Sequence, residues 1–121
     1  MSIHSYQDLK VWQFGMDLAV AVYQLTQDFP KQEIYGLASQ LRRAAVSVTS
    51  NIAEGAARDS TKEFLNFLSI ALGSLAEIET QLILAQRLSY LSEQDLQICL
   101  SKTSEIGRMV RGLQKALKAK L

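Results

Sequence analysis

Two polar side chains in the middle of the sequence have a spacing that raises the question of an active site. Asn51 and Glu54 lie three positions apart, and Gly55 follows directly in the stretch AAVSVTSNIAEGAARDSTKEF (44–64). The pair could belong to a catalytic site or a ligand loop, or to a solvated helix face that ends at a glycine. It could also be partly buried and fix the register of a helix or a subunit contact, as single buried polar groups can.

Metal and nucleophile chemistry lack the partners that they need. Metal sites in four-helix bundles use Glu-x-x-His pairs, but the one histidine, His4, lies near the start of the sequence. Glu54, Glu77 and Glu79 alone would form a poor transition-metal site, although carboxylates can bind magnesium. The serines have no interior histidine as a base, which leaves a serine–lysine pair open. The phosphate-binding patterns Gly-x-x-x-x-Gly-Lys-Ser/Thr and Gly-x-Gly-x-x-Gly are absent. We therefore expect no enzyme, no metal and no cofactor.

A run of basic residues near the end of the sequence suits phosphate binding. After Glu105 every charged side chain is a cation, and four of these cations step by three, four and three positions: Arg108, Arg111, Lys115 and Lys118. Cations near a helix C-terminus also complement the helix dipole, so the run needs no ligand. A ring of subunits would multiply it into a positive surface for a nucleic-acid backbone, with Arg42 and Arg43 as further candidates.

Helices must position these side chains, because apolar residues recur with a period near 3.6 in four segments. Start signals stand at Ser5, at Ser60 with Glu63, and at Ser92, and Gly55 suits a left-handed helix end. Connections near 29–35, 55–60 and 89–92 are short enough to join antiparallel neighbours. The sequence thus predicts an all-α, up-down-up-down four-helix bundle, a single domain over 1–121.

Each segment carries an apolar stripe that we expect to face the core. In the first segment the core stripe is Leu9, Trp12, Met16, Ala19, Tyr23 and Thr26. The stripes of the other three segments are Leu37, Leu41, Ala44, Val48 and Ile52; Phe64, Leu68, Ala71, Leu75, Ile78, Leu82 and Ala85; and Leu96, Cys99, Thr103, Ile106, Val110, Leu113 and Leu117. The first segment has a second apolar stripe, which we expect to contact another copy of the chain: Val11, Leu18, Val22 and Leu25.

Composition limits the class of protein. A chain of 121 residues fits one domain, and its net charge of +1 is too small for a general polyanion binder. A single cysteine, Cys99, is more typical of a buried core residue than of a disulfide. The sequence begins without a signal-peptide pattern and has no run of about 18 apolar residues, so we expect a cytoplasmic protein with no membrane partner.

Four ordered motifs resemble the bacterial four-helix-bundle proteins of the 23S rRNA intervening-sequence family. They are YQDLKVWQ (6–13), YGLASQLRRAAVSVTSNIAEG (35–55), FLSIALGSLAEIETQL (67–82) and EIGRMVRGL (105–113). The family pattern has proline or alanine near Thr49. This resemblance implies a ring-like homopentamer without known catalytic activity. A more distant similarity, to the accessory protein of diversity-generating retroelements, implies RNA or DNA and a reverse transcriptase as partners.

Two functions follow, from different classes. One is an oligomeric nucleic-acid-binding or ribonucleoprotein accessory module that uses the six basic residues named above. The other is a homo-oligomeric scaffold for a protein partner, with no role in nucleic-acid binding. The relative's strong overall basicity is missing here at a net charge of +1, so only the local run of cations favours the first.

Overall fold

The computed structural model describes residues 5–121, in which four α-helices and two short 3-10 helices account for all regular structure. No strand occurs in this range, so the predicted all-α class with four helices is confirmed. His4 lies outside the described residues. The elements in chain order are η1 (Tyr6–Asp8), α1 (Lys10–Thr26), η2 (Lys31–Glu33), α2 (Leu37–Ala56), α3 (Thr61–Arg87) and α4 (Glu93–Lys118).

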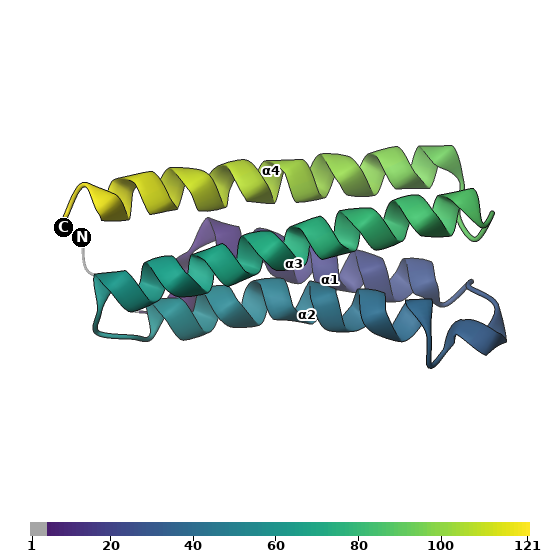
Figure 1. The fold of residues 1–121 in the computed structure, drawn as a ribbon, viewed down its shortest axis with the longest axis horizontal. Helices are drawn as coiled ribbons and strands as arrows, with labels where there is room; N and C mark the ends of the chain where they lie inside the picture. The colour runs from purple at the N-terminus through teal and green to yellow at the C-terminus, as the bar shows by residue number, and fades with distance from the viewer. Residues whose placement is uncertain (1–4) are drawn as a thin grey trace.

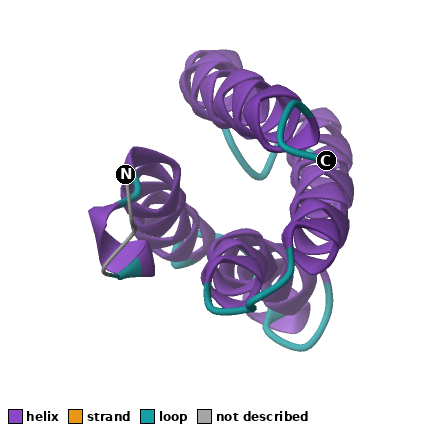
Figure 2. Cartoon of the chain, turned by 90° about the vertical axis from the view of Figure 1, so that its left-hand side faces the viewer, coloured by secondary structure: helices purple, strands orange, loops and turns teal. Residues whose placement is uncertain are grey.

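The four α-helices lie alongside one another, and their connections alternate between the two ends of the molecule (Figure 1). Each helix contacts its neighbours in sequence, and α1 also contacts α4. The most extensive contact is between α2 and α3, and neither diagonal pair, α1 with α3 or α2 with α4, comes into contact. Seen from one end, the helices follow an open curve rather than a closed square (Figure 2). These contacts are compatible with a bundle.

Side-chain caps set the starts of the last two helices, as predicted. Ser60 Oγ accepts a hydrogen bond from the Glu63 backbone N–H at 3.2 Å, and Ser92 Oγ accepts one from the Asp95 N–H at 3.0 Å. The start predicted at Ser5 is wrong for α1, because Ser5 caps the short η1 instead. Leu9 is extended between the two elements, so α1 begins only at Lys10.

Gly55 does not close α2 in a left-handed conformation, so that prediction is wrong. No glycine among the described residues has a positive φ, and α2 continues through Gly55 to Ala56. Gly55 is buried, and a Cβ at this position would lie 2.8 Å from Phe67 Cβ and 2.9 Å from Phe64 Cδ1. The glycine is needed because α3 approaches the α2 backbone too closely for a side chain.

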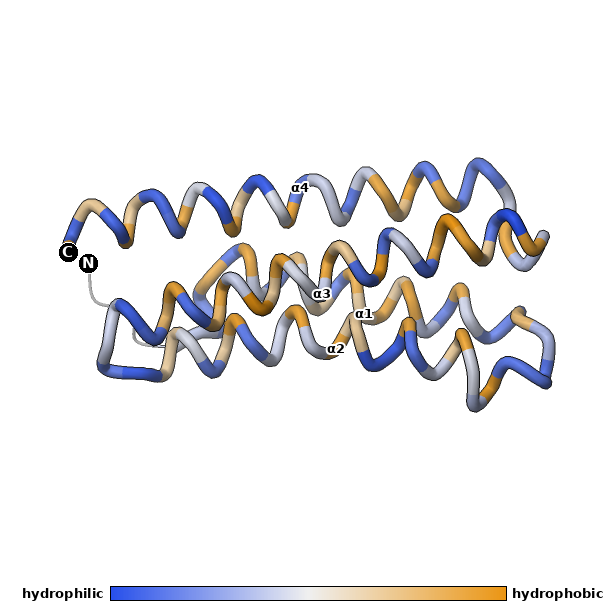
Figure 3. The backbone as a smooth tube through the Cα atoms, in the orientation of Figure 1, coloured by the Kyte–Doolittle hydropathy of each residue, from blue (hydrophilic) through white to orange (hydrophobic). Residues whose placement is uncertain are grey.

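The core confirms the predicted stripes of three helices. Every residue of the stripes expected on α2, α3 and α4 is buried except Leu113, which is half-buried. Hydrophobic and hydrophilic residues accordingly alternate along each helix (Figure 3). Cys99 is a core residue as predicted, and burial raises the pKa of its thiol.

On α1 the prediction is wrong for the second stripe and only partly right for the core stripe, of which Ala19 and Thr26 are buried and Leu9 and Trp12 are half-buried. Leu18 and Val22 are 0% exposed and Val11 is buried, so the stripe assigned to a second copy belongs to the core of the subunit. From the stripe assigned to the core, Met16 and Tyr23 are 41% and 43% exposed.

Close packing at Gly15 explains the error on α1. Gly15 lies on the same face as Val11, Leu18 and Val22, and a Cβ there would be 3.2 Å from Thr49 Cβ of α2. The small residue lets the two helices approach and fixes the rotation of α1. Leu25, the fourth residue of the misassigned stripe, is half-buried against the same core.

One helix, α3, is long and apolar enough to cross a membrane by length and composition alone. Its most apolar 18-residue window has a mean hydropathy of 1.4. Core helices pass the same test, and α3 lies between α2 and α4 with apolar residues packed against both. Packing accounts for part of this composition, since 39% of the window is buried, whereas Ile70, Ile83 and Leu84 are exposed.

Candidate nucleic-acid interface

The basic stripe, defined as Arg108, Arg111, Lys115 and Lys118, lies on the C-terminal half of α4, and all four side chains are exposed. Arg108 is held in place because its Nη1 donates a hydrogen bond to Ser104 Oγ at 3.0 Å, one turn earlier. Within residues 5–121 the one salt bridge joins Arg58 to Glu63 at 3.5 Å. The positive charges of the stripe are therefore not neutralised by ion pairs with the described acids.

Arg42, one of the predicted nucleic-acid-binding residues, is half-buried and makes contacts within the subunit. Its Nε donates to Thr26 Oγ1 at 2.8 Å, and its Nη2 donates to the Tyr23 carbonyl at 3.4 Å. The guanidinium carbon also lies 4.8 Å from the centre of the Tyr23 ring. Arg42 thus ties α2 to the C-terminal end of α1, where a cation is favourable.

Arg43 is exposed but lies apart from the basic stripe. It borders a pocket of about 290 Å³ together with Gln40, Ser47 and Glu77, on the α2–α3 side of the molecule. Since α2 and α4 do not contact each other, one subunit does not bring Arg43 next to the stripe. Within one subunit, Arg43 and the basic stripe therefore lie on separate surfaces.

A second pocket, here called the α3–α4 pocket, lies beside the first half of the stripe. It has a volume of about 250 Å³ and is bordered by both arginines of the stripe and by one carboxylate, that of Glu79. The Thr103 hydroxyl donates to Glu79 Oε2, 2.6 Å away. Sequence analysis missed this arrangement, because Glu79 and Thr103 lie on different helices and nothing in their spacing predicts the contact.

Asn51 and Glu54 lie in different surroundings. Asn51 is half-buried, and its Nδ2 donates to the Ser47 carbonyl at 2.7 Å and to Ser47 Oγ at 2.9 Å. Ser47 Oγ in turn lies 2.9 Å from Ser74 Oγ of α3, within hydrogen-bonding distance. Asn51 therefore belongs to a polar contact between two helices of one subunit, whereas Glu54 is exposed on the solvated face.

The same contact continues along the two helices, and we call the whole set the α2–α3 seam. Gln81 is buried, and its Nε2 donates at 3.2 Å to both Gln40 Oε1 and Glu77 Oε2. Its Oε1 is the one buried side-chain oxygen or nitrogen without a partner in the described part of the chain. The seam consists of Gln40, Ser47, Asn51, Ser74, Glu77 and Gln81.

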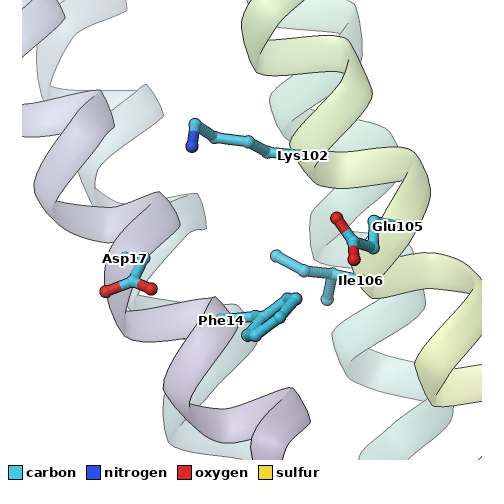
Figure 4. A pocket seen from close by; sticks show the side chains of 5 residues that line it. All are labelled: Phe14, Asp17, Lys102, Glu105 and Ile106. Carbon is cyan, nitrogen blue, oxygen red and sulfur yellow. The ribbon is translucent and has the colours of Figure 1, made fainter.

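A third pocket lies between α1 and α4 and has a volume of about 220 Å³. Figure 4 shows Asp17 on α1, Lys102 and Glu105 on α4, and the Phe14 ring pointing toward Ile106. The pocket thus places two carboxylates and an ammonium group beside apolar walls. Across residues 5–121, no three His, Cys, Asp or Glu side chains are grouped so that they could hold a metal ion.

Glu33 is a charged side chain whose partners lie within the subunit. Its Oε1 accepts a hydrogen bond from the Leu37 backbone N–H at 3.0 Å and so caps α2. Its Oε2 accepts one from the Tyr90 hydroxyl at 2.9 Å, which ties η2 to the connection between α3 and α4. The bonds from Leu37 and Tyr90 lower the pKa of Glu33, and the bond to Glu33 raises the pKa of Tyr90.

Comparison with known proteins agrees with the fold and the motifs. Residues 7–112 match the family model described as 23S rRNA-intervening sequence protein. A search of curated proteins gave no match. Among solved structures the chain is similar to a protein of unknown function from the S23 ribosomal protein family of Bacteroides thetaiotaomicron VPI-5482. The TM-score is 0.78 at 25% identity, over 87% of this chain and 98% of the other. The resemblance predicted from the motifs is confirmed, and the chain belongs to the 23S rRNA-intervening sequence protein family.

Proposed function

We propose that the protein is a non-enzymatic, cytoplasmic accessory module that binds RNA or DNA through the basic stripe of α4. The observation that carries this proposal is the row of four exposed cations without ion pairs to the described acids. Phosphate backbones are bound by such rows, because each contact releases a condensed counterion. The sequence around the stripe, EIGRMVRGL, is also one of the motifs that the family resemblance rests on.

The helix dipole explains only part of the stripe. Its effect on a side chain falls off within the last turn of a helix. Because α4 ends at Lys118, Lys115 and Lys118 lie within that turn, but Arg108 is ten residues from the end. The dipole therefore does not account for the two arginines, whereas a bound phosphate would.

Assembly into a ring is the second part of the proposal. We expect consecutive helices to be antiparallel, in up-down-up-down order, and copies of this bundle to form the homopentamer that the resemblance implies. The apolar surface that suits a neighbour is on α1, where Met16, Val20 and Tyr23 are exposed at helical spacing. A ring would place several basic stripes on one assembly and raise its affinity for a polyanion.

Sedimentation tests the assembly. The wild-type protein should sediment as an oligomer, and Val20→Glu should shift it toward a single subunit, because a carboxylate would be buried in the interface. Gln94→Glu, a change at an exposed position in the first turn of α4, is the control and should leave the mass unchanged. A wild-type protein that sediments as one subunit would contradict the ring.

A scaffold for a protein partner is the second candidate function. Tyr35 is 96% exposed and the adjacent Ile34 is exposed as well, just before α2 begins. Exposed aromatic and aliphatic side chains of this kind often serve as anchors in protein contacts. Such a partner could be a reverse transcriptase or another protein.

Binding to a labelled, structured RNA tests the proposal. Replacing the four cations of the stripe by glutamine keeps good helix formers and removes four charges. We expect this variant to lose most of its affinity at about 50 mM salt, where phosphate contacts are strongest. A matched control replaces four exposed cations outside α4 by glutamine: Lys10, Lys31, Lys62 and Arg87. Equal losses in both variants, or no binding by the wild-type protein, would contradict the proposal and favour the scaffold.

A further inference from the structure

The α3–α4 pocket has opposite charges on its border that do not neutralise each other. Glu79 borders the pocket from α3, and Arg108 and Arg111 border it from α4. Neither arginine comes within the 4.0 Å of the Glu79 carboxylate that would form a salt bridge, since the one such pair among residues 5–121 is Arg58 with Glu63. A carboxylate and two guanidinium groups thus face the same space without an ion pair between them.

The Glu79 carboxylate is held in a fixed orientation. Thr103 is 1% exposed, and its hydroxyl donates to Glu79 Oε2 at 2.6 Å, which fixes one of the two carboxylate oxygens. Oε1 has no hydrogen bond to any described residue. Glu79 is half-buried, so this second oxygen is available to a ligand in the pocket without full exposure to water. A preoriented acceptor of this kind is typical of a recognition site.

The remaining walls suit a flat ring. Leu72, Leu75 and Ala76 contribute apolar surface from α3, and Gly107 on α4 leaves room for Arg111 Nη1, which would lie 3.2 Å from a Cβ at this position. A volume of about 250 Å³ is below the roughly 300–1,000 Å³ of pockets that enclose a drug-sized ligand. The pocket therefore fits one ring system of a larger molecule that continues outside it.

We propose that the α3–α4 pocket binds one guanine base of a single-stranded nucleic acid. Guanine presents N–H donors on its Watson–Crick edge, which match the Glu79 carboxylate. It presents the acceptors O6 and N7 on its other edge, and arginine contacts to these atoms are the commonest base-specific ones. Uracil and cytosine lack this combination of a double donor edge and a double acceptor edge.

The position of the pocket favours a single strand. In a duplex the Watson–Crick edge is already paired, whereas unpaired bases can be splayed out and read on that edge. The pocket shares Arg108 and Arg111 with the basic stripe, so a strand whose phosphates lie along Lys115 and Lys118 could place a base in it. This inference rests on the proposed function, because the stripe must hold the backbone.

Two RNA oligonucleotides that differ at one position test the proposal. Both are single-stranded, and one carries a single guanine where the other carries inosine, which lacks the 2-amino group. The wild-type protein should bind the guanine oligonucleotide about fivefold more tightly or better, because inosine lacks one hydrogen bond to the charged Glu79 carboxylate. In Glu79→Gln this preference should shrink toward equality.

Glu77→Gln is the matched control. It removes the same charge two residues away, on the α2–α3 side of α3, so its effect on the two oligonucleotides should be equal and the guanine preference should persist. Equal binding of both oligonucleotides by the wild-type protein would overturn the guanine pocket but leave the basic stripe standing. Absence of any RNA binding would overturn the proposed function and this inference together. The wild-type comparison needs no variant, so it decides the matter even where Glu79→Gln fails to fold.

Discussion

Most polar side chains of the α2–α3 seam find partners within the subunit, whereas most cations of the basic stripe on α4 do not. In the seam, Ser47 contacts Ser74, Asn51 donates to Ser47, and Gln81 reaches Gln40. On the stripe, Lys115 and Lys118 have no hydrogen-bond or ion-pair partner among the described residues. Folding of one subunit explains the seam, because buried polar groups must be satisfied. It does not explain the two arginines of the stripe, which is why the stripe is the better candidate for a binding surface.

Gly55, where α2 meets α3, is closely packed, whereas Gly112 on α4 is not. The largest change in stability is expected from a substitution at Gly55. Gly55→Ala would place a Cβ 2.8 Å from Phe67 Cβ, so α3 would have to move. Overpacking of this kind costs about 1–3 kcal/mol, which exceeds the gain in helix propensity. We expect a lower free energy of unfolding in a urea titration. An unchanged or higher stability would show that the helices are not as closely packed as described.

Removing a serine hydroxyl from each region gives the next largest difference. Ser47→Ala takes away the partner of the buried Ser74 and of Asn51, and an unsatisfied buried group costs about 1–3 kcal/mol. Ser104→Ala makes the same chemical change on the exposed side of α4, where only Arg108 loses a partner. The first variant should therefore unfold at lower urea than the second. Equal midpoints would remove the distinction between the two regions.

Gly112 lies in the stripe's half of α4 and should behave oppositely to Gly55. A Cβ there would meet no atom of the subunit within 4 Å. Gly112→Ala should raise the free energy of unfolding by up to about 1 kcal/mol, because alanine favours the helix. Thermal unfolding followed by circular dichroism measures the change. A loss of stability together with a smaller sedimenting mass would instead place Gly112 in contact with a neighbouring subunit.

Glu33 extends the comparison to a charged side chain that is satisfied within the subunit, and its effect is the smallest. Its lowered pKa means that the contribution to stability is present above the ordinary value of 4.5 and is lost as the pH falls through the folded-state pKa. Glu33→Gln should make unfolding less sensitive to acid.

The pKa of Tyr90 is shifted in the opposite direction from that of Glu33. Its pKa is raised, so its contribution is complete below the ordinary value of 10.0 and is lost as the pH rises through the folded-state pKa. Tyr90→Phe should therefore reduce the loss of stability in alkali. Urea titrations across both pH ranges test the pair, and identical pH profiles for wild type and variants would show that the Glu33–Tyr90 contact does not stabilise the fold.

Most helix positions could be predicted from the sequence, because local signals set them. Ser60 and Ser92 are caps that act within one turn, and the apolar stripes of α2, α3 and α4 each offer one clear core face. The rotation of α1 could not be predicted in this way. Both of its stripes are apolar, and the choice between them depends on Gly15 packing against Thr49 of another helix.

In the candidate site, too, features within one helix could be predicted, whereas contacts between helices could not. The four cations of the stripe could be found from their spacing, since they follow one another on a single helix. The contact of Arg42 with Thr26 could not be found from spacing, because Thr26 belongs to α1, sixteen residues away. The α3–α4 pocket was missed because Glu79 and Thr103 meet only after α3 and α4 pack together.

The salt dependence of RNA binding tests the central claim most directly, because it counts phosphate contacts. The logarithm of the association constant should fall linearly with the logarithm of the salt concentration for the wild-type protein. In the variant that carries glutamine at Arg108, Arg111, Lys115 and Lys118, the magnitude of this slope should drop by roughly three for four contacts removed. The control with glutamine at Lys10, Lys31, Lys62 and Arg87 should keep the wild-type slope. A stripe variant whose slope equals that of the wild-type protein would show that α4 does not contact the nucleic-acid backbone.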